Sequence, residues 1–174
     1  LAVSRGAPQA AMPQLERWLS ERGEDATVRE MLAELHMKAG GMTAAAEQYE
    51  RIIGAGEASA RVYNNLANIR LALGKGDALQ AAEKAYALAP EDARVLDTLG
   101  WVLAQSGRLD EALRHLRDAR LRAPENGEIR WHLAEVLAKQ GRSREARAEL
   151  EGALQGQPSG EWVEAARGLL GRLP

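Results

Sequence analysis

The sequence has 174 residues, no cysteine and no phenylalanine, with 23 basic and 25 acidic side chains. Disulfides and thiolate metal sites are therefore excluded, and the near-neutral charge argues against nucleic acid or an anionic membrane surface as the partner. Alanine, leucine, arginine and glutamate are abundant and β-branched residues are few, which predicts an all-α protein. No apolar run approaches the roughly 18 residues of a membrane-spanning helix, so direct membrane insertion is not expected.

The first residues predict an irregular entry followed by one helix. Glycine, serine and proline occur close together in residues 1–7, and an amphipathic pattern then covers residues 9–22. Its apolar positions are Ala11, Leu15, Trp18 and Leu19. We interpret residues 8–25 as half of a repeat, with Trp18 packing at the end of the domain. Because the chain begins at Leu1, we expect a fragment of a longer protein, with any targeting signal outside it.

Four helix-pair repeats of about 34 residues follow. We place them at residues 26–59, 60–92, 93–126 and 127–160, with a closing cap helix at residues 161–173. A small residue follows a leucine in the first helix of each repeat, at Ala33, Ala67, Gly100 and Ala134. An alanine recurs early in each second helix, at Ala45, Ala78, Ala112 and Ala146. The recurrence predicts neighbouring repeats that bury one continuous core, in a single domain over residues 1–174.

The third repeat shows the pattern most completely. Gly100 stands inside a helix, where glycine costs about 1 kcal/mol relative to alanine, so we expect it to permit close approach of another helix. Gly107 is expected to reverse the chain, and Pro124 to end the second helix.

Trp162 lies in the last helix, outside the repeats, and is expected to pack as part of the cap.

Residues for catalysis, metals or cofactors are not grouped in the sequence. His36, His115 and His132 lie in three different repeats, and none has a second histidine or a cysteine at ligand spacing. The glycines at residues 40–41 and 74–76 follow no strand and lack the rest of a phosphate-loop motif. We therefore expect no catalytic residue, no metal and no cofactor, and predict a protein that is not an enzyme.

The repeat pattern resembles the tetratricopeptide repeat (TPR) family over nearly the whole chain. The family's leucine followed by glycine or alanine, its alanine in the second helix and its closing proline all occur in the third repeat, whereas Glu57 replaces the proline of the first. The resemblance implies a right-handed α-solenoid that acts as a protein-interaction scaffold. It also implies a concave groove, lined by the first helices, that binds a peptide or protein segment.

The groove residues implied by this resemblance lie on the first helices and face away from the core. They are Arg61, Asn64, Asn68, Arg94, Asp97, Trp101, Gln105, Trp131 and Glu135. Asn64 and Asn68 stand one turn apart, so their amides could bond an extended peptide backbone, although solvated asparagines often bind only water. Trp101 and Trp131 could be aromatic platforms for a ligand, or could pack between repeats.

A narrower resemblance concerns the PrsT family, TPR proteins of bacterial exosortase (PEP-CTERM) systems. It is carried by residues 63–68, 76–79, 83–90, 95–101 and 128–134, and covers roughly residues 60–173. It implies an exported protein of a Gram-negative bacterium, periplasmic or associated with the outer membrane, in exopolysaccharide production and protein sorting.

Two other classes of function stay open from the sequence. The repeats could be a regulatory or substrate-presenting segment of a larger enzyme such as a glycosyltransferase. A helical-repeat nucleic-acid binder is disfavoured by the formal net charge of −2. The identity of the partner and the oligomeric state are not determined by the sequence.

Overall fold

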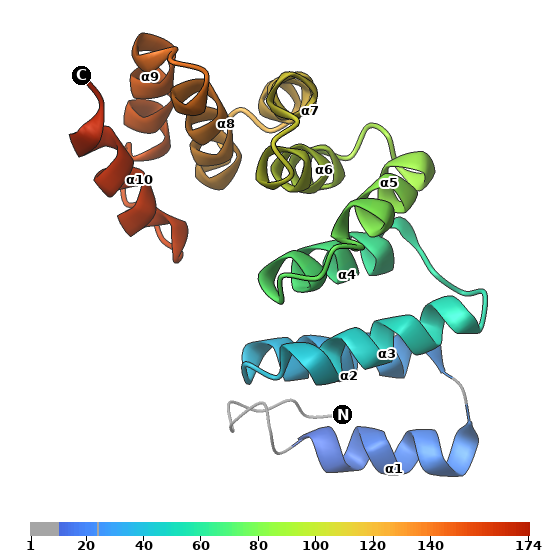
Figure 1. Ribbon diagram of the computed structural model, residues 1–174. Helices are drawn as coiled ribbons and strands as arrows, with labels where there is room; N and C mark the ends of the chain where they lie inside the picture. Colours follow the sequence, from blue (N-terminus) through green and yellow to red (C-terminus); the bar gives the residue numbers. More distant parts are fainter. Residues whose placement is uncertain (1–10, 24) are drawn as a thin grey trace. The chain divides into compact units, whose positions relative to one another are not determined.

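The computed structural model describes residues 11–23 and 25–174. Within these residues the chain forms ten α-helices and no strand, which confirms the predicted all-α class (Figure 1). The helices are α1 (Met12–Arg22), α2 (Ala26–Lys38), α3 (Met42–Gly54), α4 (Ala60–Ala72), α5 (Ala78–Leu88), α6 (Ala93–Gln105), α7 (Leu109–Arg122), α8 (Gly127–Lys139), α9 (Ser143–Ala153) and α10 (Trp162–Arg172).

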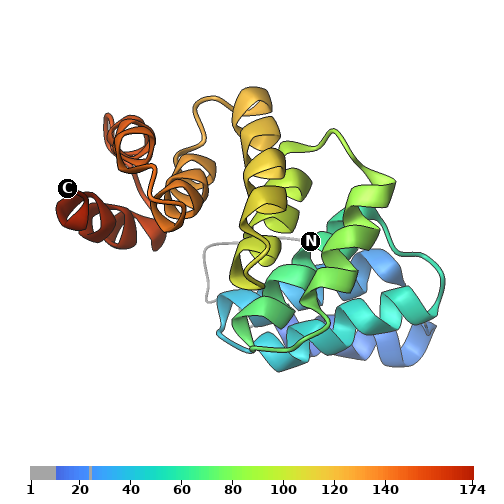
Figure 2. The same cartoon turned by 45° about the horizontal axis from the view of Figure 1, so that its top comes forward.

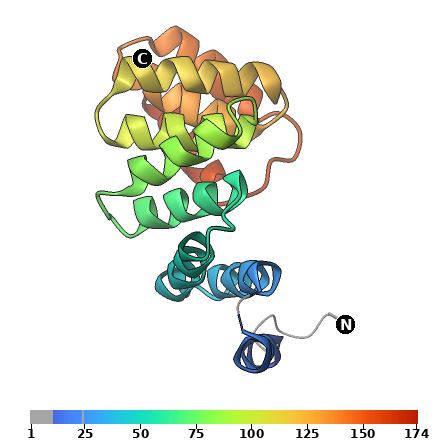
Figure 3. The same ribbon diagram turned by 90° about the vertical axis from the view of Figure 1, so that its right-hand side faces the viewer.

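Successive helices form antiparallel pairs within two compact units. The pairs are α2 with α3, α4 with α5, α6 with α7, and α8 with α9, and the two members of each pair lie side by side (Figures 1 and 3). The first unit ends at Leu88 and contains α1 to α5, and the second begins at Ala89 and contains α6 to α10. In the second unit α10 packs against α8 and α9 (Figure 2).

The first helix of each pair begins at a polar side chain that caps free backbone amides. The carboxylate of Asp25 accepts from the amide of Val28, and the hydroxyl of Ser59 accepts from the amide of Val62. Asp92 caps α6 and Asn126 caps α8 in the same way. A cap of this kind stabilises a helix by about 1 kcal/mol, so local sequence determines where these four helices start.

Close packing of α6 on α7 depends on Gly100. A Cβ atom at Gly100 would lie 2.6 Å from Leu116 Cγ and 3.2 Å from the Ala112 carbonyl oxygen. The expectation that this glycine permits close helix approach is therefore confirmed. Gly107 follows α6 with a φ of 79°, in the left-handed region that glycine adopts without steric cost, and it reverses the chain as predicted.

The two end tryptophans differ in their surroundings. Trp162 at the start of α10 lies against Gly127, where an added Cβ atom would be 2.6 Å from its ring, so its predicted packing role is confirmed. Trp18 is 38% exposed, with the Arg22 guanidinium 3.9 Å from its ring centroid. The expectation that Trp18 packs as an end cap is therefore only partly met, because one of its ring contacts is a surface arginine.

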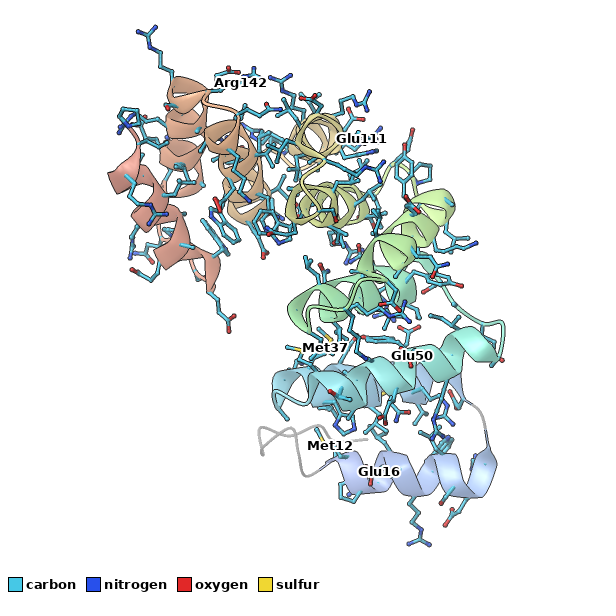
Figure 4. The ribbon with its side chains drawn as sticks, viewed as in Figure 1. Met12, Glu16, Met37, Glu50, Glu111 and Arg142 are labelled. Carbon is cyan, nitrogen blue, oxygen red and sulfur yellow. The ribbon has the colours of Figure 1, made fainter. Side chains whose placement is uncertain are left out.

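Tyr49 is the largest fully buried side chain of the first unit. Its hydroxyl accepts a hydrogen bond of 2.9 Å from the Asn65 amide and lies 3.9 Å from the sulfur of Met37, which is labelled in Figure 4. Burial raises the pKa of the Tyr49 hydroxyl, partly opposed by the hydrogen bond from Asn65. This bond connects α3 to α4, and so fixes the first helix of one pair against the second helix of the pair before it.

Candidate functional site

The residues predicted to contact a ligand all lie on first helices of the pairs. In the first unit these helices are α2 and α4. Arg61 on α4 forms ion pairs with Glu30 and Glu34, which stand one turn apart on α2. The Arg61 Nη1 atom lies 3.1 Å from Glu34 Oε1. Arg61, predicted to face a ligand, is thus already engaged by two carboxylates of the preceding pair.

Asn64 and Asn68 lie one turn apart on α4, as the helix spacing predicts. Asn68 is exposed, whereas the side-chain oxygen of Asn64 is buried and has no hydrogen-bond partner among the described residues. A buried acceptor without a donor costs roughly 1–3 kcal/mol. The Asn64 side chain would therefore gain from a rotation that brings this oxygen to a donor.

In the second unit Asp97 on α6 and His132 on α8 form a buried pair. Asp97 is 9% exposed and His132 is 6% exposed, and Asp97 Oδ1 lies 2.8 Å from His132 Nδ1. An ionised carboxylate only accepts hydrogen bonds, so the imidazole N–H is the donor. The sequence suggested an outward-facing Asp97, but the structure buries its carboxylate against a histidine from the next repeat.

Trp101, Trp131 and His132 form an aromatic cluster above this pair. Trp101 stacks on His132 with centroids 4.2 Å apart and planes inclined by 17°, and Trp131 lies 4.7 Å from the same imidazole. The two indoles are 5.4 Å apart at their centroids and are tilted by 47°. Both indoles remain partly exposed. The ammonium of Lys139 lies 5.8 Å from the centroid of Trp101.

The structure therefore brings three of the predicted residues, Asp97, Trp101 and Trp131, into one cluster. His132 completes it, and its role was missed at the level of sequence because a lone histidine carries no motif. The useful signal was its place directly after Trp131, on the face of α8 that meets α6. We call Asp97, Trp101, Trp131 and His132 the α6–α8 cluster.

Glu135 lies one turn beyond Trp131 on the same face of α8. It is partly exposed, and the ion pairs found in residues 11–23 and 25–174 do not include it. Lys139 follows one further turn along this face. Glu135 therefore adds an acidic group next to the α6–α8 cluster.

Two other predicted residues lie apart from the cluster. The amide of Arg94 donates to Asp92 Oδ1 at 2.8 Å, and the Arg94 guanidinium lies 3.1 Å from Asp92 Oδ2. The hydrogen bond from Arg94 lowers the pKa of the Asp92 carboxyl. Arg94 therefore supports the cap of α6. Gln105 is exposed at the last residue of α6.

The second helices of two pairs, α7 and α9, border a shallow cavity of about 420 Å³. Its lining is Arg117, Arg120, Leu121, Leu133, Leu137, Glu145, Ala148 and Glu149. Ion pairs cross it, since Glu149 is 3.0 Å from Arg120. Pairs on this outer surface, such as Glu111 with Arg108 and Arg142 with Glu145, account for side chains labelled in Figure 4. Balanced charges make this cavity a weaker candidate than the α6–α8 cluster.

The described residues contain no group of three or more histidine, aspartate and glutamate side chains placed to hold a metal ion. Burial lowers the pKa of His115 on α7, and the Arg114 charge lowers it further. In the part of the chain that the structure describes, no helix has the length and apolarity needed to cross a bilayer.

Comparison with known families shows three matches, each to a model of the tetratricopeptide repeat. They cover residues 1–60, 58–123 and 103–173, and so together nearly the whole chain. No curated protein matches the sequence at a significant level.

Several solved structures share the fold. YrrB, described as a TPR protein with an unusual peptide-binding site, is 20% identical, with a TM-score of 0.71 over 92% of this chain and 84% of YrrB. MamA from Desulfovibrio magneticus RS-1 is 18% identical, with a TM-score of 0.77 over 87% of this chain and 86% of that one. TTC0263, a thermophilic TPR protein from Thermus thermophilus, is 26% identical, with a TM-score of 0.74 over 94% of this chain and 90% of that one.

Proposed function

Because the chain belongs to the tetratricopeptide repeat family, we propose that it is a non-enzymatic interaction scaffold that binds a peptide or protein segment through the first helices of its repeats. The observation that carries this proposal is the α6–α8 cluster, in which two partly exposed indoles from successive repeats meet beside the buried, hydrogen-bonded pair Asp97 and His132. YrrB, which has the same fold, is described as having a peptide-binding site.

The physical argument starts from Trp101 and Trp131. A tryptophan offers a large, rigid contact area and loses little conformational entropy on binding, which makes it a frequent anchor at interfaces. The stack on His132 holds the Trp101 ring in place, and the bond from His132 to Asp97 holds the imidazole. The two indoles are therefore positioned before a ligand arrives, and this lowers the entropic cost of binding.

The first unit supports the proposal with a different kind of contact. In the proposed complex the Asn64 side chain, partly exposed as a whole, would turn its buried oxygen outward to accept from a backbone amide, and Asn68 is exposed one turn further along α4. The set Arg61, Asn64, Asn68, Arg94, Asp97, Trp101, Gln105, Trp131 and Glu135 remains our proposal for the peptide-contacting residues. Among them, Asp97 and Arg94 also hold neighbouring side chains in place, His132 and Asp92 respectively.

The test is selection of ligands from a randomised peptide library, followed by affinity measurements on variants. Trp101→Ala and Trp131→Ala should each lower the affinity for the selected peptide by about tenfold or more, the loss typical of an interface anchor. Trp18→Ala is the matched control, because Trp18 is also a partly exposed tryptophan but lies on α1 in the other unit. Equal affinity in the wild type and both cluster variants would overturn the assignment.

We also propose that the scaffold works in a bacterial exosortase and exopolysaccharide system. The support is the likeness of residues 63–68, 83–90 and 95–101 to the PrsT family. The test is the complete open reading frame with its gene neighbours. An export signal beside exosortase or polysaccharide genes is expected, and a gene setting with neither would contradict this context without affecting the scaffold proposal.

A further inference from the structure

The first unit shows how this repeat holds an arginine. Glu30 and Glu34 are the fifth and ninth residues of α2, one turn apart on a single face. Between them they bind the guanidinium of Arg61, the second residue of α4 in the following repeat. Two carboxylates on a first helix thus engage a planar cation from the first helix of the next repeat. This arrangement favours arginine because a guanidinium can bond both acids at once.

The last repeat has the corresponding positions without an arginine. Trp131 and Glu135 are the fifth and ninth residues of α8, as Glu30 and Glu34 are of α2. The helix that follows this pair, α10, begins with Trp162, which packs on Gly127. In the described part of the second unit, the acids Glu111, Glu145, Glu149 and Glu164 all have arginine partners. No such pair includes Glu135 or Glu128, which lie one turn on either side of Trp131.

A cation already lies over the aromatic part of this face. Lys139 Nζ is 5.8 Å from the Trp101 centroid, within the range of a cation–π interaction. The Lys139 side chain is exposed and belongs to the last residue of α8, so a better-matched cation could displace it. Glu128 and Glu135 outweigh Lys139 by one charge along the α8 face.

We propose that Trp101, Trp131 and Glu135 bind an arginine side chain of the partner peptide, with the guanidinium against the indoles and ion-paired to Glu135. This inference rests on the proposed peptide-binding function and specifies its ligand. Arginine fits better than lysine because its planar group stacks on an indole and still directs N–H donors to a carboxylate. In the absence of the peptide, the Lys139 ammonium occupies the position near the Trp101 ring.

The experiment uses four pools of nine-residue peptides that are randomised except at the centre, where each pool has arginine, lysine, citrulline or leucine. Citrulline keeps the planar shape and most N–H groups of arginine but carries no charge. Immobilised protein is exposed to an equal mixture of the pools, and retained peptides are counted by mass spectrometry. Arginine peptides should be enriched about tenfold over citrulline peptides, and by less over lysine peptides.

Variants separate this inference from the scaffold proposal. Glu135→Gln should remove most of the arginine preference, whereas Glu151→Gln, an exposed acid on α9 without an arginine partner among the described residues, should keep it. Lys139→Met should increase arginine retention. Retention that depends on both tryptophans but is equal for arginine and citrulline overturns the inference and leaves the scaffold intact. If no pool is retained better by the wild type than by Trp101→Ala and Trp131→Ala, both proposals fail.

Discussion

Asp97 Oδ1 and His132 Nδ1 lie 2.8 Å apart and connect α6 to α8 beneath the two indoles. The pair is buried, so neither group could exchange its partner for water without cost. It comes from adjacent repeats, and it therefore fixes the face of one first helix relative to the next. The position of Trp101, which stacks on His132, depends on it.

Removing the carboxylate should therefore disturb both stability and the aromatic cluster. Asp97→Ala leaves the His132 N–H buried without an acceptor, and the free energy of unfolding should fall by about 1–3 kcal/mol. Asp97→Asn keeps an acceptor and should cost less. Urea denaturation followed by tryptophan emission measures both, with exposed Asp118→Asn as the control. A loss for Asp97→Ala no larger than that for the control would contradict the structural role of the pair.

Gly100 should tolerate no side chain. The Cβ atom of Gly100→Ala would lie 2.6 Å from Leu116 Cγ, and the resulting overpacking should lower the free energy of unfolding by about 1–3 kcal/mol. Gly171→Ala in α10, where a Cβ atom meets nothing within 4 Å, should instead be neutral or stabilising by up to about 1 kcal/mol. Thermal denaturation of the two variants should show shifts of opposite sign, or a shift only for Gly100→Ala.

Asn126 should set the start of α8. Its side-chain oxygen accepts from the amides of Glu128 and Ile129 at 3.0 and 3.2 Å. Asn126→Ala should therefore lower the free energy of unfolding by about 1 kcal/mol. Amide hydrogen exchange in the first turn of α8 should become faster. Ser159→Ala, at an exposed residue before α10 that caps no helix, is the control. Unchanged exchange at residues 128–130 would show that the cap is dispensable.

His115 should make the protein less stable in mild acid. Burial lowers its pKa in the folded state, so the unfolded chain binds the proton first as the pH falls below about 6.5. The stability that His115 contributes is complete above that pH and is lost as the pH falls through the lower folded pKa. His115→Gln should therefore lose less stability than the wild type between pH 7 and pH 5. A larger loss in the variant would contradict the direction of the shift.

The repetitive parts of the fold could be predicted from the sequence because their causes are local. Glycine is required at residue 100 because two helices approach closely there, and at residue 107 because the turn needs a left-handed backbone conformation. The structure shows both. Trp162 packs as expected. Trp18 was harder to place because its ring contacts Arg22, one turn away on its own helix, and such surface contacts leave no pattern in the sequence.

The candidate site could be predicted only in outline. Helix spacing predicted the helix faces that carry Trp101 and Trp131. It did not predict that Asp97 would form a hydrogen bond with a histidine of the next repeat. That contact depends on how α6 and α8 are rotated relative to each other, which the packing of both helices on α7 determines. The capping role of Arg94 was likewise missed, because it follows from the backbone conformation at Asp92. Whether the nine proposed residues contact a ligand stays a prediction.

The most direct test of the central claim is a titration that follows the four indole N–H signals in a nitrogen–proton correlation spectrum. Conservative variants assign the signals of Trp18, Trp101, Trp131 and Trp162, and a peptide selected from the library is then added. We predict concentration-dependent shifts at Trp101 and Trp131, with Trp18 and Trp162 unchanged. Saturable peptide binding that leaves both Trp101 and Trp131 unshifted would contradict the account.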